Sequence, residues 1–222
     1  MSSDTGSAVV FSSVTTGRYL QNVSFRAAEG GVTAVVTGSR TLDELLVRLM
    51  LGLVAPETGT VQIFGHDIST MKPRDMAVTR RRIGVVSPVG GLVSNLKVWE
   101  NVVLPLEYHT NLAPEEIEAR GREALRLIGY GGNLMGLPGL LSPFERRQVG
   151  CARAMALGAD LMVYDNLFEG LLPAEQKQLR DAVLSFQKSV PGRTALFVSS
   201  VPNQLEGLHP DDMVTLTDGA CP

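Results

Sequence analysis

A strand, a tight turn and a helix follow one another between residues 32 and 53, and this order constrains the fold more than any other stretch of the chain. The strand is the apolar run VTAVVT at 32–37, and Gly38 opens the turn. Leucines and one methionine then recur with the spacing of a single helix face, at positions 42, 45, 46, 49, 50 and 53. Strand, turn and helix in this order form the frame of a phosphate-binding loop.

The residues that carry phosphate chemistry are missing from this frame. Such a loop needs glycines for close approach and a lysine for the β- and γ-phosphates. Only Gly38 remains, and Asp43 and Glu44 stand where lysine and serine are expected. A carboxylate there replaces an attraction with a repulsion, each roughly 4 kcal/mol at ~4 Å and an effective dielectric constant of ~20. Acids at a helix start also complement the helix dipole, and we favour that role over phosphate binding.

Composition favours a compact soluble domain and excludes several function classes. The 222 residues are 44% hydrophobic, and their net charge of −3 argues against a general nucleic-acid binder. Two distant cysteines and three scattered histidines predict neither a disulfide framework nor a metal site. Residues 1–8 do not read as a signal peptide and no apolar run has membrane-spanning length, so we expect a cytoplasmic protein. The basic run at 80–82 is expected to form a solvated turn.

Alternating strands and helices, with a helical insert, predict an α/β fold. Strands are expected at 9–14, 19–26, 32–37, 60–64, 82–86, 161–165, 195–199 and 213–216. Helices are expected at 98–106, 114–128, 144–157 and 174–188. Pro105 should interrupt the first helix, whereas Pro114 suits the first turn of the second and Gly129 its end.

Five segments spread along the chain carry a family resemblance: LQNVSF at 20–25, VRLMLGLVAPETGTVQIFGHDI at 47–68, RRRIGVV at 80–86, LKVWENVVLPL at 96–106 and CARAMALGADLMVYD at 151–165. In this order they resemble the ATP-binding cassette of ABC transporters over nearly the whole chain. The resemblance implies one cassette domain over 1–222. It would have a RecA-like P-loop core (1–87 and 155–222), an antiparallel β subdomain and an inserted α-helical subdomain at about 88–154.

The resemblance also locates the family's catalytic positions, and five of them carry unsuitable residues. The P-loop lysine, the serine after it, the Q-loop glutamine, the catalytic glutamate and the switch histidine fall on Asp43, Glu44, Pro88, Asn166 and Ser200. The amide of an asparagine has no useful basicity toward water. Without magnesium ligands, the charge that develops on a transferred phosphoryl group has no counterion. We therefore predict a pseudoenzyme without catalytic residues and without a metal.

The family's signature motif, LSGGQ or LSGGE, is altered in the same direction. It corresponds to Leu141, Ser142, Pro143, Phe144 and Glu145, so both glycines are lost. Pro143 removes a backbone N–H, and the side chain of Phe144 blocks the close approach that glycine amides give to a phosphate. The signature is therefore not expected to contact nucleotide.

No nucleotide cofactor is expected. Asp165 keeps the family's Walker B aspartate and is interpreted as hydrogen-bonded scaffold. The remaining candidates for contact with phosphate or magnesium are Gly38, Ser39, Arg40, Thr41 and Asp165. One alternative is a divergent but active ATPase using ATP and magnesium, with Arg40 in place of the lysine. Another is a soluble adaptor or inhibitor of a partner ATPase.

The resemblance implies partners rather than a reaction. We predict a non-catalytic subunit under a transporter permease, peripheral on the inner face of the cell membrane. It would pair with a second cassette, as a homodimer or with an active ATPase. Residues 87–106 would line the permease groove, with Leu92 and Trp99 in contact. The segment 95–125 most resembles cassettes of MCE-type (Mla-like) phospholipid transporters, which implies lipid transport and an MCE-type lipid-binding protein in the same complex.

Overall fold

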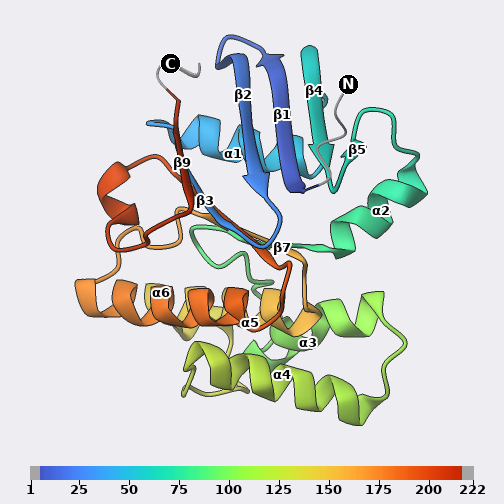
Figure 1. Ribbon diagram of the computed structural model, residues 1–222. Helices are drawn as coiled ribbons and strands as arrows, with labels where there is room; N and C mark the ends of the chain where they lie inside the picture. Colours follow the sequence, from blue (N-terminus) through green and yellow to red (C-terminus); the bar gives the residue numbers. More distant parts are fainter. Residues whose placement is uncertain (1–5, 217–222) are drawn as a thin grey trace.

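The structure, a computed structural model, describes residues 6–216 and contains two sheets and a group of helices (Figure 1). The strands are β1 (Ser7–Thr16), β2 (Leu20–Ala28), β3 (Val32–Val36), β4 (Thr58–Ile63), β5 (His66–Asp67), β6 (Ile83–Val86), β7 (Leu161–Asp165), β8 (Thr194–Ser199) and β9 (Asp212–Thr215). The helices are α1 (Arg40–Met50), α2 (Pro73–Arg81), α3 (Val98–His109), α4 (Pro114–Ile128), α5 (Pro143–Leu157) and α6 (Pro173–Lys188), with 3-10 turns at Pro138–Leu140 and Pro202–Leu205.

The two sheets differ in strand direction. The five-stranded sheet is parallel, in the order β6-β7-β8-β3-β9, and the four-stranded sheet is antiparallel, in the order β2-β1-β4-β5. Helices α3 to α6 lie together on one side of the parallel sheet, and α1 lies on the other side with the antiparallel sheet (Figure 1). The expected α/β core with an antiparallel subdomain and a helical subdomain is confirmed.

Alternate residues of the parallel strands face two separate cores. On β7, Met162 and Tyr164 pack with α3 to α6, whereas Leu161 and Val163 pack with α1 and the antiparallel sheet. The parallel sheet is therefore buried on both faces. Because its strands run in one direction, the carboxyl ends of β3, β7 and β8 lie at the same edge, which is where a parallel α/β sheet places its functional groups.

Helices α5 and α6 each begin one residue earlier than expected, and two other helices differ more from their expected bounds. Helix α1 ends at Met50, so Leu53 lies beyond it with a side chain that is 57% exposed. Helix α3 runs through Pro105 to His109, so Pro105 does not interrupt it. The proline removes one intrahelical hydrogen bond, while Val102 and Leu106 on either side of it are fully buried and hold the helix in place.

Helix α2 is not indicated by the sequence pattern. Met76 is its only buried residue, so the segment has no apolar periodicity to reveal a helix. The run at 80–82 is exposed to solvent as expected, but it is not a separate turn, because Arg80 and Arg81 form the last turn of α2. Arg82 follows the helix and pairs with Asp160 at 2.6 Å.

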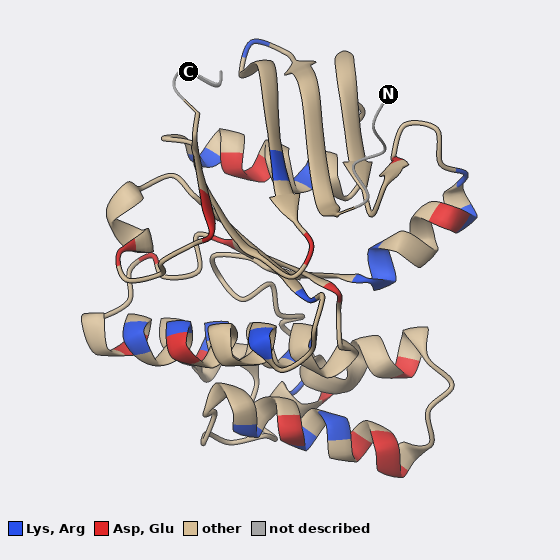
Figure 2. Cartoon of the chain, viewed as in Figure 1, with Lys and Arg blue, Asp and Glu red and all other residues tan. Residues whose placement is uncertain are grey.

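The helical subdomain consists of α3, α4 and α5, which pack against one another. Helix α5 continues past the expected boundary at 154, ends at Leu157 and packs on β6. The division of the chain at 87/88 and 154/155 stays a prediction. Charged side chains are concentrated on the helices, above all on α4 and α6 (Figure 2). Among residues 6–216, no helix is both long enough and apolar enough to cross a membrane.

Candidate functional site

The candidate site lies at the edge of the parallel sheet where β3, β7 and β8 end. Thr37 follows β3, Asn166 follows β7 and Ser200 follows β8, and α1 brings Asp43 to the same place. Gly38 allows the chain to pass from β3 into α1, because its φ of +70° lies in the left-handed region. Ser39 is the residue before the first turn of α1 and its side chain forms no capping hydrogen bond.

Asp43 is the centre of a buried hydrogen-bond network. Its side chain is 1% exposed. The hydroxyl of Thr37 donates to Asp43 Oδ1 at 2.5 Å, and the amide of Asn166 donates to Asp43 Oδ2 at 2.6 Å. Both carboxylate oxygens therefore accept from neutral donors, so the charge of Asp43 is stabilised without a cation.

Asn166 uses every hydrogen-bonding group of its side chain. Its Nδ2 donates to Asp43 and, at 2.8 Å, to Asp165 Oδ1. Its Oδ1 accepts from the backbone N–H and the hydroxyl of Ser200, both at 3.1 Å. The backbone of Asn166 has a φ of +46°, a left-handed conformation that asparagine tolerates better than most residues. With two donors and two acceptors satisfied, the amide has no free group for a ligand.

Asp43 lies in the first turn of α1, where an acid complements the helix dipole as expected. Its side chain also points into the molecule, toward the end of β7. Glu44 is exposed and pairs with Arg48 at 3.3 Å on the outer face of α1. The two acids are adjacent in sequence, but the helix turns them in different directions.

Arg40 and Thr41 lie in the first turn of α1, on exposed or half-exposed positions. The guanidinium of Arg40 forms an ion pair with Glu169, in the turn that follows β7. This pair satisfies the only cation that the sequence offers as a replacement for the P-loop lysine. Glu169 itself was missed by sequence reasoning, since an acid three positions after Asn166 has no signal of its own.

Asp165 is half-buried beside two other acids. Burial raises the pKa of Asp165, and the hydrogen bond from Asn166 lowers it. The charges of Asp43 and Glu44 raise this pKa further, and that of Arg40 lowers it. The net result is a pKa above the ordinary value. Within residues 6–216, no group of three or more His, Cys, Asp or Glu is arranged to hold a metal ion.

The signature-like segment begins helix α5. The hydroxyl of Ser142 accepts from the Glu145 N–H at 3.2 Å, and the Glu145 carboxylate accepts from the Ser142 N–H at 2.8 Å. Pro143 occupies the first helical position, so the polar groups of this segment form a capping box. Leu141 and Phe144 are half-buried against the core on the side of the helical subdomain.

Arg147 joins the signature-like segment to the turn after β7, and sequence reasoning missed this role. Its guanidinium donates to the backbone oxygens of Pro143, at 3.2 Å, and Glu169, at 2.6 Å. The side chain is 6% exposed, and burial lowers the pKa of Arg147. A buried arginine that binds carbonyl oxygens has no sequence signature, because its partners are backbone atoms.

The other predicted contact residues lie away from this network. Pro88 is half-buried in the turn after β6. Leu92 and Trp99 are partly buried against the core of the helical subdomain. The ring of Trp99 lies so close to Gly121 of α4 that a Cβ added there would be 2.8 Å from Cη2. Trp99 is thus largely a packing residue between α3 and α4, and its contact with a permease stays a prediction.

Comparison with known proteins identifies the family. The family model described as ABC transporter matches residues 20–169, which include Asp43, Asn166 and the signature-like segment. The chain belongs to the ABC transporter family. Membership of this family explains the cassette fold, the P-loop frame and the order of segments along the chain.

Named relatives of this ABC-family chain include two methionine import ATP-binding proteins. MetN 1 of Salmonella typhimurium is 29% identical over 84% of this chain and 53% of the relative, and MetN of Bradyrhizobium diazoefficiens is 31% identical over 84% and 54%. The probable ribonucleotide transport ATP-binding protein mkl of Mycobacterium leprae is 28% identical over 88% and 56%. The chain spans about half the length of the curated relatives it matches.

Solved structures confirm the fold. The dimeric ATP-binding cassette MJ0796 bound to ADP and phosphate superposes with a TM-score of 0.84 at 22% identity, over 96% of each chain. The cbiO1 structure from Clostridium perfringens, described as part of the cbiONQ transporter complex, gives a TM-score of 0.82 at 19% identity over 98% and 87%. At these identities the likeness concerns the fold alone.

Proposed function

We propose that this ABC-family cassette is a non-catalytic subunit of a transporter. The observation that carries the proposal is the buried network of Asp43, Asn166 and Ser200, which occupy the family's P-loop lysine, catalytic glutamate and switch histidine positions. In an active cassette, the groups at these three positions would bind the nucleotide or take part in its hydrolysis. Here they bind one another, and none is a general base or a phosphate-binding cation.

The charges around the loop do not suit a magnesium triphosphate. Asp43 and Asp165 place two carboxylates at the end of the sheet, and the exposed Glu44 adds a further negative charge. Arg40 is paired with Glu169. A triphosphate would meet repulsion where the lysine position should attract it. A magnesium ion bound by Asp165 would lack the serine and glutamine positions, which are Glu44 and Pro88. We therefore propose that this cassette uses neither ATP nor magnesium.

The proposed setting is a membrane complex. The cassette would lie on the inner face of the membrane under a permease and pair with a second cassette, either a copy of itself or an active ATPase. The relatives are named for methionine import and ribonucleotide transport, and lipid cargo with an MCE-type partner finds no support in those names. The Asp43 network concerns ATP hydrolysis, and the proposal names no cargo.

The second candidate function is an ATP-driven transport cassette, and the relatives favour it. Each of those described above is named as an ATP-binding protein. In this chain, Gly38 is conformationally suited to a phosphate loop and Asp165 keeps the Walker B acid. The candidate requires Arg40 to leave Glu169 and bind phosphate in the presence of three nearby acids.

Calorimetric titration of the purified chain with Mg-ATP up to millimolar concentration, together with a phosphate-release assay, separates the two candidates. Non-catalytic function predicts no saturable heat, no thermal stabilisation and no phosphate release. Saturable binding with turnover that Asp165→Asn abolishes would establish the ATPase and overturn the proposal. Glu118→Gln, at an exposed position on α4 outside the network and the signature-like segment, is the control for nonspecific loss of activity.

A further inference from the structure

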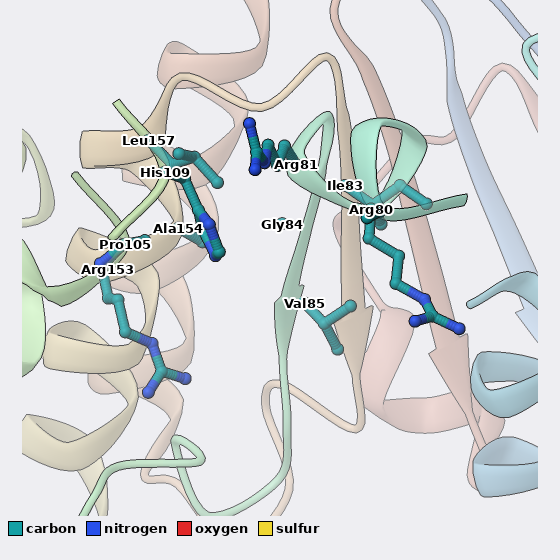
Figure 3. A pocket seen from close by; sticks show the side chains of 11 residues that line it. Arg80, Arg81, Ile83, Gly84, Val85, Pro105, His109, Arg153, Ala154 and Leu157 are labelled. Atoms are coloured by element: carbon teal, nitrogen blue, oxygen red, sulfur yellow. The ribbon is translucent and has the colours of Figure 1, made fainter. Parts of the chain in front are cut away.

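A cavity of about 500 Å³ lies at the amino ends of β3 and β8, at the opposite edge of the parallel sheet from the Asp43 network. It is bordered by the end of α6 and the loop after it, by the turn between β2 and β3, and by the segment that leads to β9. We call it the α6 cavity. It is separate from the hollow between β6, α3 and α5 (Figure 3), which adjoins the segment 87–106 that we expect to contact a permease. Its size falls within the range of small-molecule sites.

Gln187 brings an unused hydrogen-bond acceptor to the α6 cavity. The residue lines the cavity and is only 5% exposed. Its Nε2 donates to the carbonyl oxygens of Gly30, at 2.6 Å, and Arg193, at 2.9 Å, and these two bonds fix the orientation of the amide. Its Oε1 accepts no hydrogen bond from any residue between 6 and 216. Such an acceptor favours a ligand that supplies a donor.

Charged groups of both signs border the α6 cavity without meeting each other. Asp211 accepts from the Val32 N–H through Oδ2 at 2.7 Å, which leaves Oδ1 for another donor. Lys188, in the last turn of α6, is exposed. In the part of the chain that the structure describes, neither Lys188 nor the exposed His209 forms an ion pair or a hydrogen bond. A ligand that carries both charges can therefore join groups that the protein leaves apart.

Apolar side chains complete the lining. Leu208 is buried and Leu184 is half-buried, while Val190, in the loop after α6, is 47% exposed. This surface offers no donor or acceptor, so it suits a short hydrocarbon. The carboxyl end of α6 also lies at the cavity, and the negative end of its dipole favours a cationic group there.

We propose that the α6 cavity binds a small aliphatic aminocarboxylate, such as a free amino acid. Its ammonium group is bound by Asp211 and Gln187, its carboxylate by Lys188, and its hydrocarbon by the apolar side chains. An anion alone would leave Gln187 Oε1 without a donor, and a cation alone would leave Lys188 without an acceptor. A small molecule fits better than a protein segment, because Gln187 is nearly buried. The proposal goes beyond the proposed function and does not depend on it.

The test uses the full chain and a set of six-carbon probes. Norleucine and 6-aminohexanoate carry both charges, hexanoate carries only the carboxylate, and hexylamine carries only the ammonium group. Calorimetry at constant ionic strength should show saturable binding of at least one of the aminocarboxylates. Hexanoate and hexylamine should bind roughly tenfold or more weakly, because each lacks one charge-assisted contact. The better of the two aminocarboxylates reports how far apart the bound charges lie.

Variants assign each charge of the ligand to its partner. Asp211→Asn keeps an oxygen for the Val32 N–H but removes the negative charge, so it should reduce the preference for the aminocarboxylate over hexanoate. Lys188→Gln should instead reduce the preference over hexylamine. Asp212→Asn and Lys177→Gln, at exposed positions that do not line the cavity, are the matched controls and should bind as the parent does.

The two selective losses of preference, in variants whose thermal unfolding matches that of the parent, would support the proposal. Absence of saturable binding by the parent chain at millimolar probe would overturn it. So would equal affinity for all the probes, or the same loss of affinity in the control variants as in the cavity variants. None of these results depends on whether the chain binds or hydrolyses Mg-ATP, so the outcome is independent of the proposed function.

Discussion

The amide of Asn166 donates a 2.6 Å hydrogen bond to the carboxylate of Asp43, joining residues that are 123 positions apart in the sequence. The family resemblance aligns Asn166 with the catalytic glutamate and Asp43 with the P-loop lysine. In this chain the acid is on α1, at Asp43, and the residue that follows β7, Asn166, is a neutral donor. A single substitution at either position would leave a mismatched buried pair, so the two residues depend on each other.

The first prediction concerns this dependence. Asn166→Glu places a carboxylate against those of Asp43 and Asp165 and should destabilise the chain by about 3 kcal/mol at pH 7, as an uncompensated buried charge does. Adding Asp43→Lys should recover more than half of that loss, because the pair again consists of an acid and a cation. A double-mutant cycle from urea unfolding measures the coupling. Additive losses would show that the two side chains do not interact.

The second prediction concerns catalysis. Asp43→Lys alone should not produce ATP hydrolysis, since Pro88, Asn166 and Ser200 remain unable to position magnesium or activate water. Phosphate release is to be compared with that of the parent chain at saturating Mg-ATP. ATP hydrolysis above that background from this one substitution would mean that the carboxylate of Asp43 alone prevents catalysis.

The third prediction concerns the contact between Trp99 and Gly121. Gly121→Ala would bring a Cβ to 2.8 Å from the Trp99 ring and 3.0 Å from Val103, and overpacking of this kind costs about 1–3 kcal/mol. In a Trp99→Ala background the same change should be neutral or stabilising, because the ring is gone and alanine favours the helix. Gly131→Ala, where a Cβ meets nothing within 4 Å, is the control. Equal effects of Gly121→Ala in both backgrounds would show that the Trp99 ring does not pack against Gly121.

The fourth prediction concerns Asp165 and pH. The pKa of Asp165 is raised in the folded state, so the folded chain binds this proton more tightly than the unfolded chain. The free energy of unfolding therefore falls as the pH rises above the ordinary pKa of an aspartate. Asp165→Asn removes this cost and can still accept from the Asn166 amide. The variant should be more stable than the parent at pH 7, with the difference shrinking toward about pH 4. Thermal melts across that range measure it, and a variant that loses stability at pH 7 would show that the charge is favourable.

Much of the fold was accessible from sequence because its signals are local. Pro114 and Gly129 mark both ends of α4 through backbone preferences that need no tertiary contact, and the structure places that helix at Pro114–Ile128. Helix α2 also begins with a proline, Pro73, but no glycine marks its end and Met76 is its only buried residue, so no apolar period accompanies the start signal. The extent of α3 was also hidden, because burial of Val102 and Leu106 outweighs the local cost of Pro105.

The sequence by itself determined the class of fold and predicted the loss of the family's catalytic residue types, because strand and helix periods and residue identities are properties of short segments. Only the tertiary structure decided what the replaced residues do. The direction of the Asp43 side chain, its bond to Asn166 and the commitment of Arg40 to Glu169 depend on where parallel strands end in space. Hydrogen bonds act over about 3 Å, whatever the separation along the chain.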